Sequence, residues 1–329
     1  FAFCDVLVVG SGLAGLNAAL AAGATGARVI YADEQAEMGG WLLSSDAMID
    51  GMPATQWVED ALLRLKAMPE VKVMSRTTVF GYMDHNLLIL AERRTDHLVA
   101  PQATARERLW KVRAKQVVLA TGAHERPLVF SNNDLPGIML ASAVSTYIRR
   151  YAVLPGQRAV IFTNNDQGYD AAFALKDAGA TVTVVDARAT PDGDRSARAR
   201  QQGIEILAGH VVVEASGGKA VTGVNLYKLN SQGELAGAAG SRPCDLLAMS
   251  GGFSPVIHLH CQSSSKPVWN EEQSSFLPGK PVQAERSAGA CHGIEDLAAC
   301  ASDGVKAGLD AAMAAGLSKV AIAIPSISS

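Results

Sequence analysis

The sequence of 329 residues is poor in aromatic residues, which make up 5% of it, and it has no excess of basic residues. Its 29 lysines and arginines face 32 aspartates and glutamates, so the formal net charge is −3. Nucleic acids and anionic membranes bind basic surfaces, and single-stranded nucleic acids also stack on aromatic side chains. The composition therefore argues against a nucleic-acid partner and against a membrane partner.

Long uninterrupted apolar runs are missing as well. The alanine-rich stretches near residues 13–24 and 297–316 contain glycine, asparagine or charged residues, so we expect helices packed closely on a sheet rather than membrane spans. No basic segment precedes an apolar run at the start, so we expect no signal peptide. Both ends look cut, because the sequence opens directly on a strand and closes on the polar tail 325–329. We expect a fragment, or one module of a longer polypeptide.

The five cysteines form no C-x-x-C pair and no zinc-like cluster. A disulfide reductase relay is therefore excluded, and no metal site is expected. Scattered cysteines of this kind are usually reduced thiols, which makes a reducing cytoplasm the expected compartment.

The first part of the sequence reads as a strand–helix–strand unit. A β-branched run at 4–10 predicts a buried parallel strand, 13–24 predicts a small-residue helix, and 27–33 predicts the next strand. Apolar spacing of helical period follows at 55–67. Further strands are expected at 71–74, 77–82, 87–92 and 109–119, with a polar loop at 95–106.

A second unit of the same kind runs from Arg158 to Arg188, as a strand, a helix and a strand. Strands at 204–208, 210–214, 221–228 and 244–252, a glycine-rich hairpin near 231–240 and a final helix near 294–315 complete the chain. The two related units predict an α/β Rossmann-type fold with two dinucleotide domains, the second inserted into the first. We expect the first domain at 1–125 with 245–316, a degenerate Rossmann-like domain at 126–244, and a tail at 317–329.

The residues from Gly10 to Gly15 match G-x-G-x-x-G between the first strand and the first helix. In this motif the first glycine permits a tight turn, the second lets the backbone approach a pyrophosphate, and the third lets helix and strand pack closely. The helix N-terminus then turns free N–H groups toward the phosphates. Asp33 ends the next strand, where an acid binds the adenosine ribose hydroxyls and repels a 2′-phosphate. We therefore expect NAD or FAD rather than NADP. The motif residues expected at the cofactor are Gly10, Ser11, Gly12, Leu13, Ala14 and Gly15.

Other residues are expected around the same dinucleotide. Glu34 is a less favoured substitute for Asp33, and the glycines at 39 and 40 would let another loop approach the phosphates. The backbone of Thr78 and Val79 is a candidate partner for adenine. The Ala-Thr-Gly turn after the strand 109–119 marks the point where the chain leaves the nucleotide domain. These further cofactor-binding candidates are Glu34, Gly39, Gly40, Thr78, Val79, Ala120, Thr121, Gly122 and Gly289.

The stretch 287–293, which contains Gly289, lies where FAD-binding proteins of this class place a Gly-Asp pair on the flavin ribityl chain. The aspartate is missing here. Without that acceptor a flavin loses a charge-assisted hydrogen bond, whereas NAD does not need it. The sequence therefore favours NAD over FAD.

The second unit has Thr163 to Gly168 where its own glycine motif would stand. Asp166 could cap the following helix and would repel a phosphate, so we expect no second nucleotide there. No catalytic residue can be assigned.

Three other groups leave alternatives open. The residues 124–126 could contact a cofactor or channel, or form a buried salt-bridge cluster at the domain junction. His258, His260 and Cys261 could be a metal site on a strand, but no further ligands with convincing spacing appear, which favours a structural or interface role. Ser11 and Ser250 lack the context of a nucleophile elbow.

Three strings of the sequence resemble the α subunit of heterotetrameric sarcosine oxidases. The first is CDVLVVGSGLAGLNAALAAGATGARVIYADEQAEMGG, and the other two contain ATGAHERPLVF and SGGFSPVIHLH. The similarity covers nearly all of residues 4–316, and the last two strings are far more specific than a Rossmann motif. Related subunits occur in hydrogen cyanide synthase and in opine and proline dehydrogenases.

The resemblance implies a heterotetramer that demethylates sarcosine to glycine and forms hydrogen peroxide. It implies NAD in this chain in a structural role, FAD on a β-type flavoprotein subunit where the amine is oxidised, and covalently bound FMN at the boundary between the two subunits. It also implies a ferredoxin-like domain before this region and a folate-binding domain after it, neither of which is in the 329 residues. Two other functions stay open: a stand-alone or heteromeric dehydrogenase of amines, opines or proline that carries its own FAD, and a non-catalytic nucleotide-binding scaffold.

Overall fold

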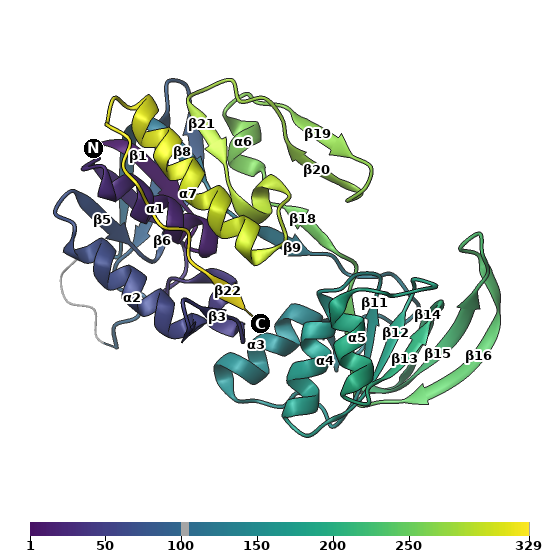
Figure 1. Cartoon of the computed structure of the whole chain (residues 1–329). Helices are drawn as coiled ribbons and strands as arrows, with labels where there is room; N and C mark the ends of the chain where they lie inside the picture. Colours follow the sequence, from purple (N-terminus) through teal and green to yellow (C-terminus); the bar gives the residue numbers. More distant parts are fainter. Residues whose placement is uncertain (100–104, 329) are drawn as a thin grey trace. The chain divides into compact units, whose positions relative to one another are not determined.

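The computed structural model describes residues 1–99 and 105–328 and divides them into two compact units. The first unit combines 1–124 with 254–329, and the second is 125–253. The chain leaves the first unit in β9 (Ala123–Glu125) and returns in β18 (Phe253–Pro255), and these two strands pair (Figure 1). The second unit is therefore inserted into the first, as predicted. Residues 100–104 of the expected loop 95–106, and Ser329 of the expected tail, lie outside the described residues.

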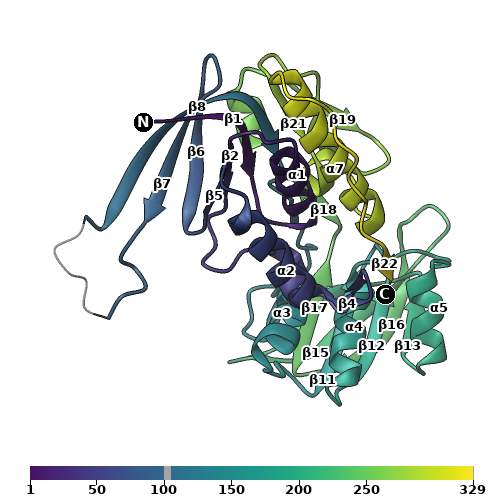
Figure 2. The same ribbon diagram turned by 60° about the vertical axis from the view of Figure 1, so that its left-hand side comes forward.

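The first unit is built on a seven-stranded sheet in the order β5-β2-β1-β8-β7-β6, with β21 beside β8. The strand β8 joins two kinds of sheet, because its first half pairs antiparallel with β7 and its second half pairs parallel with β1 and β21. Figure 2 shows the antiparallel strands β6, β7 and β8 extending away from the parallel ones. The strands are β1 (Ala2–Val9), β2 (Val29–Ala32), β5 (Val71–Met74), β6 (Thr77–Met83), β7 (Leu87–Arg93), β8 (Glu107–Leu119) and β21 (Glu285–Ser287).

Three helices cover one face of this sheet: α1 (Leu13–Ala24), α2 (Ala54–Ala67) and α7 (Leu297–Ala314). The helix α1 is buried from Leu13 to Gly23, so its small residues serve close packing on every side. On α7, a Cβ added at Gly308 would lie 2.2 Å from the carbonyl oxygen of Ala18, which shows how closely the two backbones approach. No helix of the described residues is both long and apolar enough to cross a membrane.

The opposite face of the sheet carries α6 (His258–Gln262), whose Leu259 joins the core formed with β6, β7 and β8. The sequence placed His258, His260 and Cys261 on a strand, and this prediction is wrong. Five residues are too few to reveal a helical period, so the local pattern could not separate the two structures.

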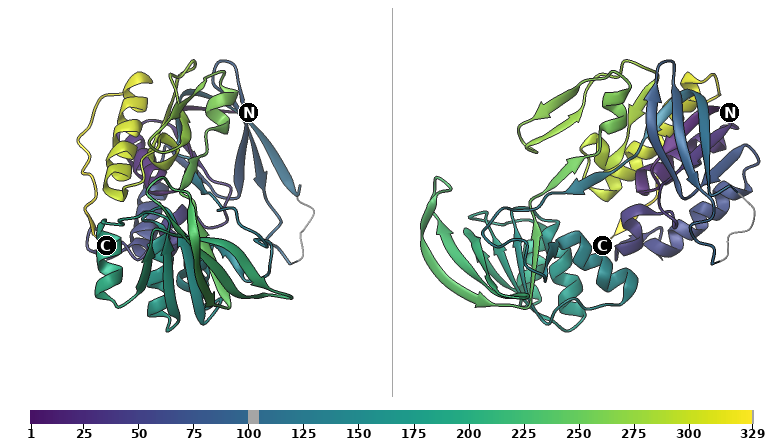
Figure 3. Two further views of the ribbon diagram at one scale, coloured as in Figure 1. Left: turned by 90° about the vertical axis from the view of Figure 1, so that its right-hand side faces the viewer. Right: turned by 180° about the vertical axis from the view of Figure 1, so that it is seen from behind.

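The second unit has a parallel sheet in the order β10-β17-β11-β12-β13. Helices cover one face of it, and a three-stranded antiparallel sheet covers the other (Figure 3). The parallel strands are β10 (Ile138–Leu140), β11 (Arg158–Thr163), β12 (Thr181–Asp186), β13 (Glu205–Ala208) and β17 (Leu246–Ser250). The helices are α3 (Ala141–Tyr151), α4 (Gly168–Asp177) and α5 (Asp194–Gln201), and the antiparallel strands are β14 (His210–Gly217), β15 (Val221–Leu229) and β16 (Leu235–Pro243).

The observed units differ from the expected domains at two places. The expected first domain resumes at 245, yet β17 pairs with both β10 and β11 and so belongs to the second unit. The expected tail 317–329 belongs to the first unit, where β22 (Ile327–Ser328) pairs with β3 (Met48–Ile49). Both differences arise from long-range pairing that leaves no local sequence signal. The remaining elements are η1 (Gly40–Ser44), β4 (Met52–Pro53), β19 (Pro267–Asn270), β20 (Ser275–Pro278) and η2 (Gly289–His292).

Candidate functional site

The glycine loop joins β1 to α1 at the carboxyl edge of the parallel strands. Gly10 has φ +101°, and a Cβ there would lie 2.2 Å from the carbonyl oxygen of Ala120. A Cβ at Gly15 would lie 1.9 Å from the carbonyl oxygen of Gly10. Both positions therefore require glycine, the first for the turn and the second for the close approach of helix to strand.

Gly12 differs from these two, because a Cβ at Gly12 would meet nothing within 4 Å. It stands at the N-cap of α1, which has no side-chain cap. The first helical hydrogen bond runs from Leu16 N–H to the Gly12 carbonyl oxygen at 2.9 Å, so the amides from Leu13 to Gly15 precede it. Open space in front of uncapped helix amides is an anion cradle of the kind that a pyrophosphate fits.

Asp33 directly follows β2 and is tied to this loop. Its Oδ2 accepts the Ser11 N–H at 2.7 Å, and its Oδ1 accepts the Gln35 N–H at 2.7 Å. Each carboxylate oxygen accepts more than one hydrogen bond, so both can still receive a sugar hydroxyl. The Ser11 amide, by contrast, serves the acid rather than a phosphate.

A second pair of glycines lies against the loop. The Gly39 N–H donates to Ser11 Oγ at 3.0 Å, and Ser11 is buried. Gly40 has φ +55°, and a Cβ there would be 3.0 Å from the Gly12 Cα. The structure thus brings Gly39 and Gly40 to the glycine loop.

The end of β8 lines the other side of the loop. The Ala120 N–H donates to the Val9 carbonyl oxygen at 2.7 Å. The hydroxyl of Thr121 donates to the Val256 carbonyl oxygen at 2.6 Å, and the Gly122 carbonyl oxygen accepts the Val256 N–H at 2.9 Å. Thr121 and Gly122 are therefore fixed where the chain leaves the first unit.

Gly289 reaches the same loop from the far end of the sequence. It has φ +72°, and a Cβ there would lie 2.6 Å from the Ala14 Cβ, on the first turn of α1. The aspartate Asp303 of α7 accepts the Gly289 N–H at 2.9 Å and pairs with His292 Nδ1 at 3.2 Å, and this hydrogen bond raises the pKa of His292. Asp303 was not among the residues expected at the site, because an acid in a helical stretch does not reveal which loop it contacts.

Glu34, Thr78 and Val79 are placed beside the loop rather than in it. Glu34 is exposed, and its carbonyl oxygen accepts the Arg93 guanidinium. Thr78 and Val79 lie on β6, paired with β7. The residue before them, Thr77, donates its N–H to the Asp33 carbonyl oxygen at 2.7 Å, so β6 begins next to the acid.

The corresponding loop of the second unit is filled by its own side chains. Asn165 Oδ1 accepts the N–H groups of Gln167 and Gly168 at 3.0 and 3.3 Å. Asp166 pairs with Arg188 at 2.8 Å, so Asn165 and not Asp166 takes the capping role expected from the sequence. A Cβ at Gly193 would lie 2.2 Å from Asp166 Oδ2, so the backbone before α5 also packs closely against Asp166. The loop is therefore occupied by its own side chains, and the absence of a second nucleotide there stays a prediction.

His260 is buried and has a protein partner at each ring nitrogen. Its Nδ1 lies 2.7 Å from Glu285 Oε1, and its Nε2 accepts the Gly279 N–H at 3.1 Å. Burial raises the pKa of Glu285. Throughout residues 1–99 and 105–328, no group of three or more His, Cys, Asp or Glu side chains is arranged to hold a metal ion.

Glu125, the middle residue of 124–126, acts within the second unit. Its Oε2 accepts the Ser142 N–H at 2.8 Å at the start of α3, and burial raises its pKa. His124 is exposed. The Glu125 side chain therefore caps the N-terminus of α3.

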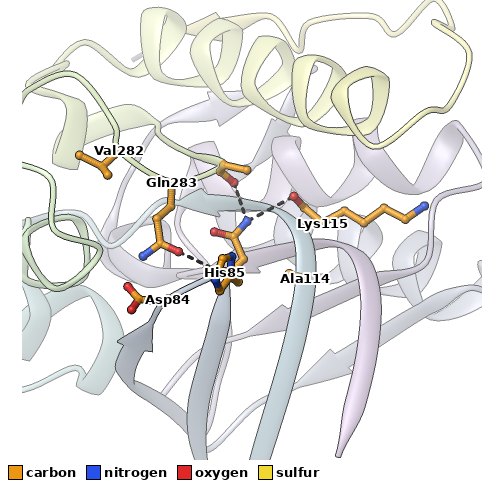
Figure 4. Close-up of a pocket in the computed structure, with 8 residues that line it drawn as sticks. Asp84, His85, Ala114, Lys115, Val282 and Gln283 are labelled. Carbon is orange, nitrogen blue, oxygen red and sulfur yellow. Dashed lines mark hydrogen bonds between the residues drawn. The ribbon is translucent and has the colours of Figure 1, made fainter.

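A pocket of about 480 Å³ lies at the opposite end of the parallel strands from the glycine loop. Asn86 at its base is buried and donates to the carbonyl oxygens of Lys115 and Ala284 at 3.2 and 3.0 Å. In Figure 4 the Lys115 side chain extends away from Asp84 and His85, and its Nζ lies 2.9 Å from Asp5. Ligands of open α/β sheets bind at the carboxyl ends of the strands, so this pocket is not the nucleotide site.

Comparison with known proteins agrees with the geometry. Residues 4–272 match the family model "Pyridine nucleotide-disulphide oxidoreductase". The α subunit of sarcosine oxidase from Corynebacterium sp. (strain P-1) is 44% identical over 322 residues, which cover 96% of this chain and 33% of that protein. One of the opine oxidase subunits of Agrobacterium tumefaciens (strain Ach5) is 29% identical over 84% of this chain and 58% of its own length.

Among solved structures, L-proline dehydrogenase from P. horikoshii superposes with a TM-score of 0.69 at 19% identity, over 97% of this chain and 57% of that one. This likeness shows the fold alone. The chain spans about a third of the length of the sarcosine oxidase subunits it matches. It is homologous to these α subunits, as the sequence resemblance indicated, and it belongs to the pyridine nucleotide-disulphide oxidoreductase family.

Proposed function

We propose that this chain binds NAD as part of a multi-subunit sarcosine oxidase, in which the amine is oxidised at FAD on a β-type partner subunit. FMN would lie at the boundary between the two subunits, and further subunits would complete the hetero-oligomer. The observation that carries the proposal is the 44% identity to the α chain of a sarcosine oxidase over 96% of this chain, together with an open glycine loop tied to Asp33.

The residues present fit an adenine dinucleotide. The space at Gly12 and the uncapped amides of α1 would hold the pyrophosphate, and Asp33 would accept the ribose hydroxyls. Ala290 stands next to Gly289, where a flavin site of this class has an aspartate. The nearby carboxylate of Asp303 belongs to α7, and its Oδ2 accepts the Gly289 N–H and pairs with His292 Nδ1. This arrangement favours NAD over FAD.

When bound, NAD supplies a nicotinamide ring capable of hydride transfer. The chain's own residues hold and orient the dinucleotide. The buried Ser11 side chain accepts the Gly39 N–H and so holds the glycine loop against the neighbouring loop. The hydrogen bonds of Thr121 and Gly122 to Val256 hold the backbone that follows β8. No residue of this chain is assigned a catalytic role.

The identity of the dinucleotide can be measured directly. Mass spectrometry of the ligand released from denatured protein is expected to give NAD, and the visible spectrum of the purified chain is expected to lack a flavin band. Recovery of FAD with a yellow protein would instead support a dehydrogenase that carries its own flavin, which the similarity to the opine oxidase of Agrobacterium tumefaciens makes the second candidate.

The role within a complex requires an activity test. Sarcosine-dependent peroxide formation is expected from the chain's full-length polypeptide only when it is combined with a β-type flavoprotein partner. The chain alone is expected to be inactive. Activity of the chain alone would refute this role, and inactivity of the reconstituted complex would favour a non-catalytic scaffold.

A further inference from the structure

Two arginines bracket the turn that carries Asp33. The Arg76 N–H donates to the Gln35 carbonyl oxygen at 2.9 Å, and the Arg93 guanidinium donates to the Glu34 carbonyl oxygen. The Arg93 N–H in turn donates to the Arg76 carbonyl oxygen at 2.9 Å, which holds the two together. The turn is therefore bonded on one side to the glycine loop, through Asp33, and on the other side to the Arg76 backbone and the Arg93 guanidinium.

One carboxylate engages both arginines. Asp96 places its two oxygens 3.2 Å from Arg76 Nη1, and its Oδ2 lies 3.6 Å from Arg93 Nη1. The side chains of Arg76, Asp96 and Arg93 are 27%, 26% and 44% exposed, so the cluster lies at the surface. His97 Nδ1 lies 3.4 Å from the same carboxylate.

This arrangement bears on which dinucleotide the site accepts. In Rossmann sites a carboxylate after the second strand selects a free ribose 2′-hydroxyl, and a nearby arginine accommodates a 2′-phosphate. Here the carboxylate of Asp33 and the two arginines, Arg76 and Arg93, are all found at the turn 33–35. A guanidinium that already donates to a carboxylate has fewer N–H groups and less net charge to offer a phosphate.

We infer that Asp96 is a specificity-determining residue: it occupies Arg76 and Arg93 as an internal anion and so keeps the ribose end of the site selective for a dinucleotide without a 2′-phosphate. This inference rests on the proposed binding of an adenine dinucleotide at the glycine loop. It makes Asp96 a second residue, after Asp33, that discriminates against a 2′-phosphate. Asp96 acts through the two arginines and is a positioning residue.

The test compares the dissociation constants of NAD and NADP, by calorimetry at one fixed salt concentration, in the wild-type chain and in Asp96→Asn. The substitution preserves the size of the side chain and removes its charge. The NADP dissociation constant is expected to fall by about tenfold, the scale of one charge-assisted hydrogen-bond pair, while that of NAD changes by less than about twofold. Asp96→Ser is the second variant, since it removes the same charge with a smaller side chain.

Two further variants make the result specific. Adding Arg93→Ala to Asp96→Asn is expected to abolish the gain in NADP affinity. Asp60→Asn, which removes the exposed partner of Arg64 on α2 at 3.8 Å, is the matched control and is expected to leave both constants unchanged. An unaltered ratio of the two constants in both Asp96 variants would overturn the inference while leaving the proposed function intact. A wild-type chain that binds neither dinucleotide would overturn both.

Discussion

At Gly12 an added Cβ would meet no atom within 4 Å, whereas at Gly15 it would lie 1.9 Å from a carbonyl oxygen. Gly12 also has φ −68°, which alanine adopts without strain. We therefore expect Gly12→Ala to fold with a stability within about 1 kcal/mol of wild type but to weaken NAD binding at least about tenfold, because the new methyl group fills the cradle. Gly15→Ala should instead lower the free energy of unfolding by about 1–3 kcal/mol.

Urea denaturation and NAD calorimetry on both variants separate the two effects. If Gly12→Ala bound NAD as tightly as wild type, the pyrophosphate could not lie in the space in front of Gly12.

Asp5 is buried within β1 and accepts hydrogen bonds from Arg28 Nε and Nη2, each at 3.1 Å, with Lys115 Nζ 2.9 Å away. The Arg28 guanidinium holds the pKa of Asp5 well below its ordinary value. A depressed folded-state pKa means that the stabilisation is complete above the unfolded pKa, about 3.9, and is lost as the pH falls below it. We expect Asp5→Asn to cost about 1–3 kcal/mol at pH 7.

The free energy of unfolding, measured by denaturant titration between pH 7 and pH 3, checks this prediction. The difference between wild type and Asp5→Asn should shrink toward the acid end. A difference that stays constant with pH would show that the charge of Asp5 contributes nothing.

The residues that sequence analysis assigned to the loop share a local signal. Gly10, Gly12 and Gly15 follow a fixed spacing, and Asp33 follows at the expected distance. Asp96 and Asp303 carry no such signal, because each acts on a turn that only the tertiary structure brings near. The roles of Thr78 and Val79 at adenine stay predictions.

At the scale of elements, the packing of α1 on α7 depends on two glycines of α7. A Cβ at Gly304 or Gly308 would lie 2.3 or 2.2 Å from a carbonyl oxygen of α1. Gly308→Ala should therefore destabilise the fold by about 1–3 kcal/mol, although alanine by itself favours a helix by about 1 kcal/mol. Ser302→Ala, at an exposed position of the same helix, should be neutral or slightly stabilising.

Thermal unfolding of these two variants provides the measurement. If Gly308→Ala were as stable as Ser302→Ala, then α1 and α7 could move apart without lowering the free energy of unfolding.

Long and buried elements were predicted from the sequence more often than short or exposed ones. Most strands of the two parallel sheets were predicted, because buried β-branched runs are distinctive. The three-residue strands β10 and β21 were not predicted. The helix α5 was missed because only Ser196 and Ala199 of its residues are buried, which leaves no apolar stripe. The short α6 was misassigned as a strand, and β19 and β20 were missed, because four or five residues define no period.

At the scale of the whole molecule, the second unit is continuous in sequence and has hydrophobic clusters on both faces of its parallel sheet. We expect residues 125–253 to fold alone with a cooperative unfolding transition. The first unit should fold without them when a short linker replaces the insert, because β9 and β18 already pair where the chain leaves and returns.

Circular dichroism during thermal unfolding of both shortened proteins tests this expectation. Absence of a cooperative transition in 125–253 would show that the two units depend on each other for stability.

The side chains that fill the loop between β11 and α4 limit how many dinucleotides residues 1–329 can hold. With Asn165 and Asp166 occupying that position, a titration of residues 1–329 should saturate at one dinucleotide per molecule. If NAD binds at the glycine loop as proposed, its nicotinamide has no partner nucleotide at the loop between β11 and α4 with which to exchange a hydride.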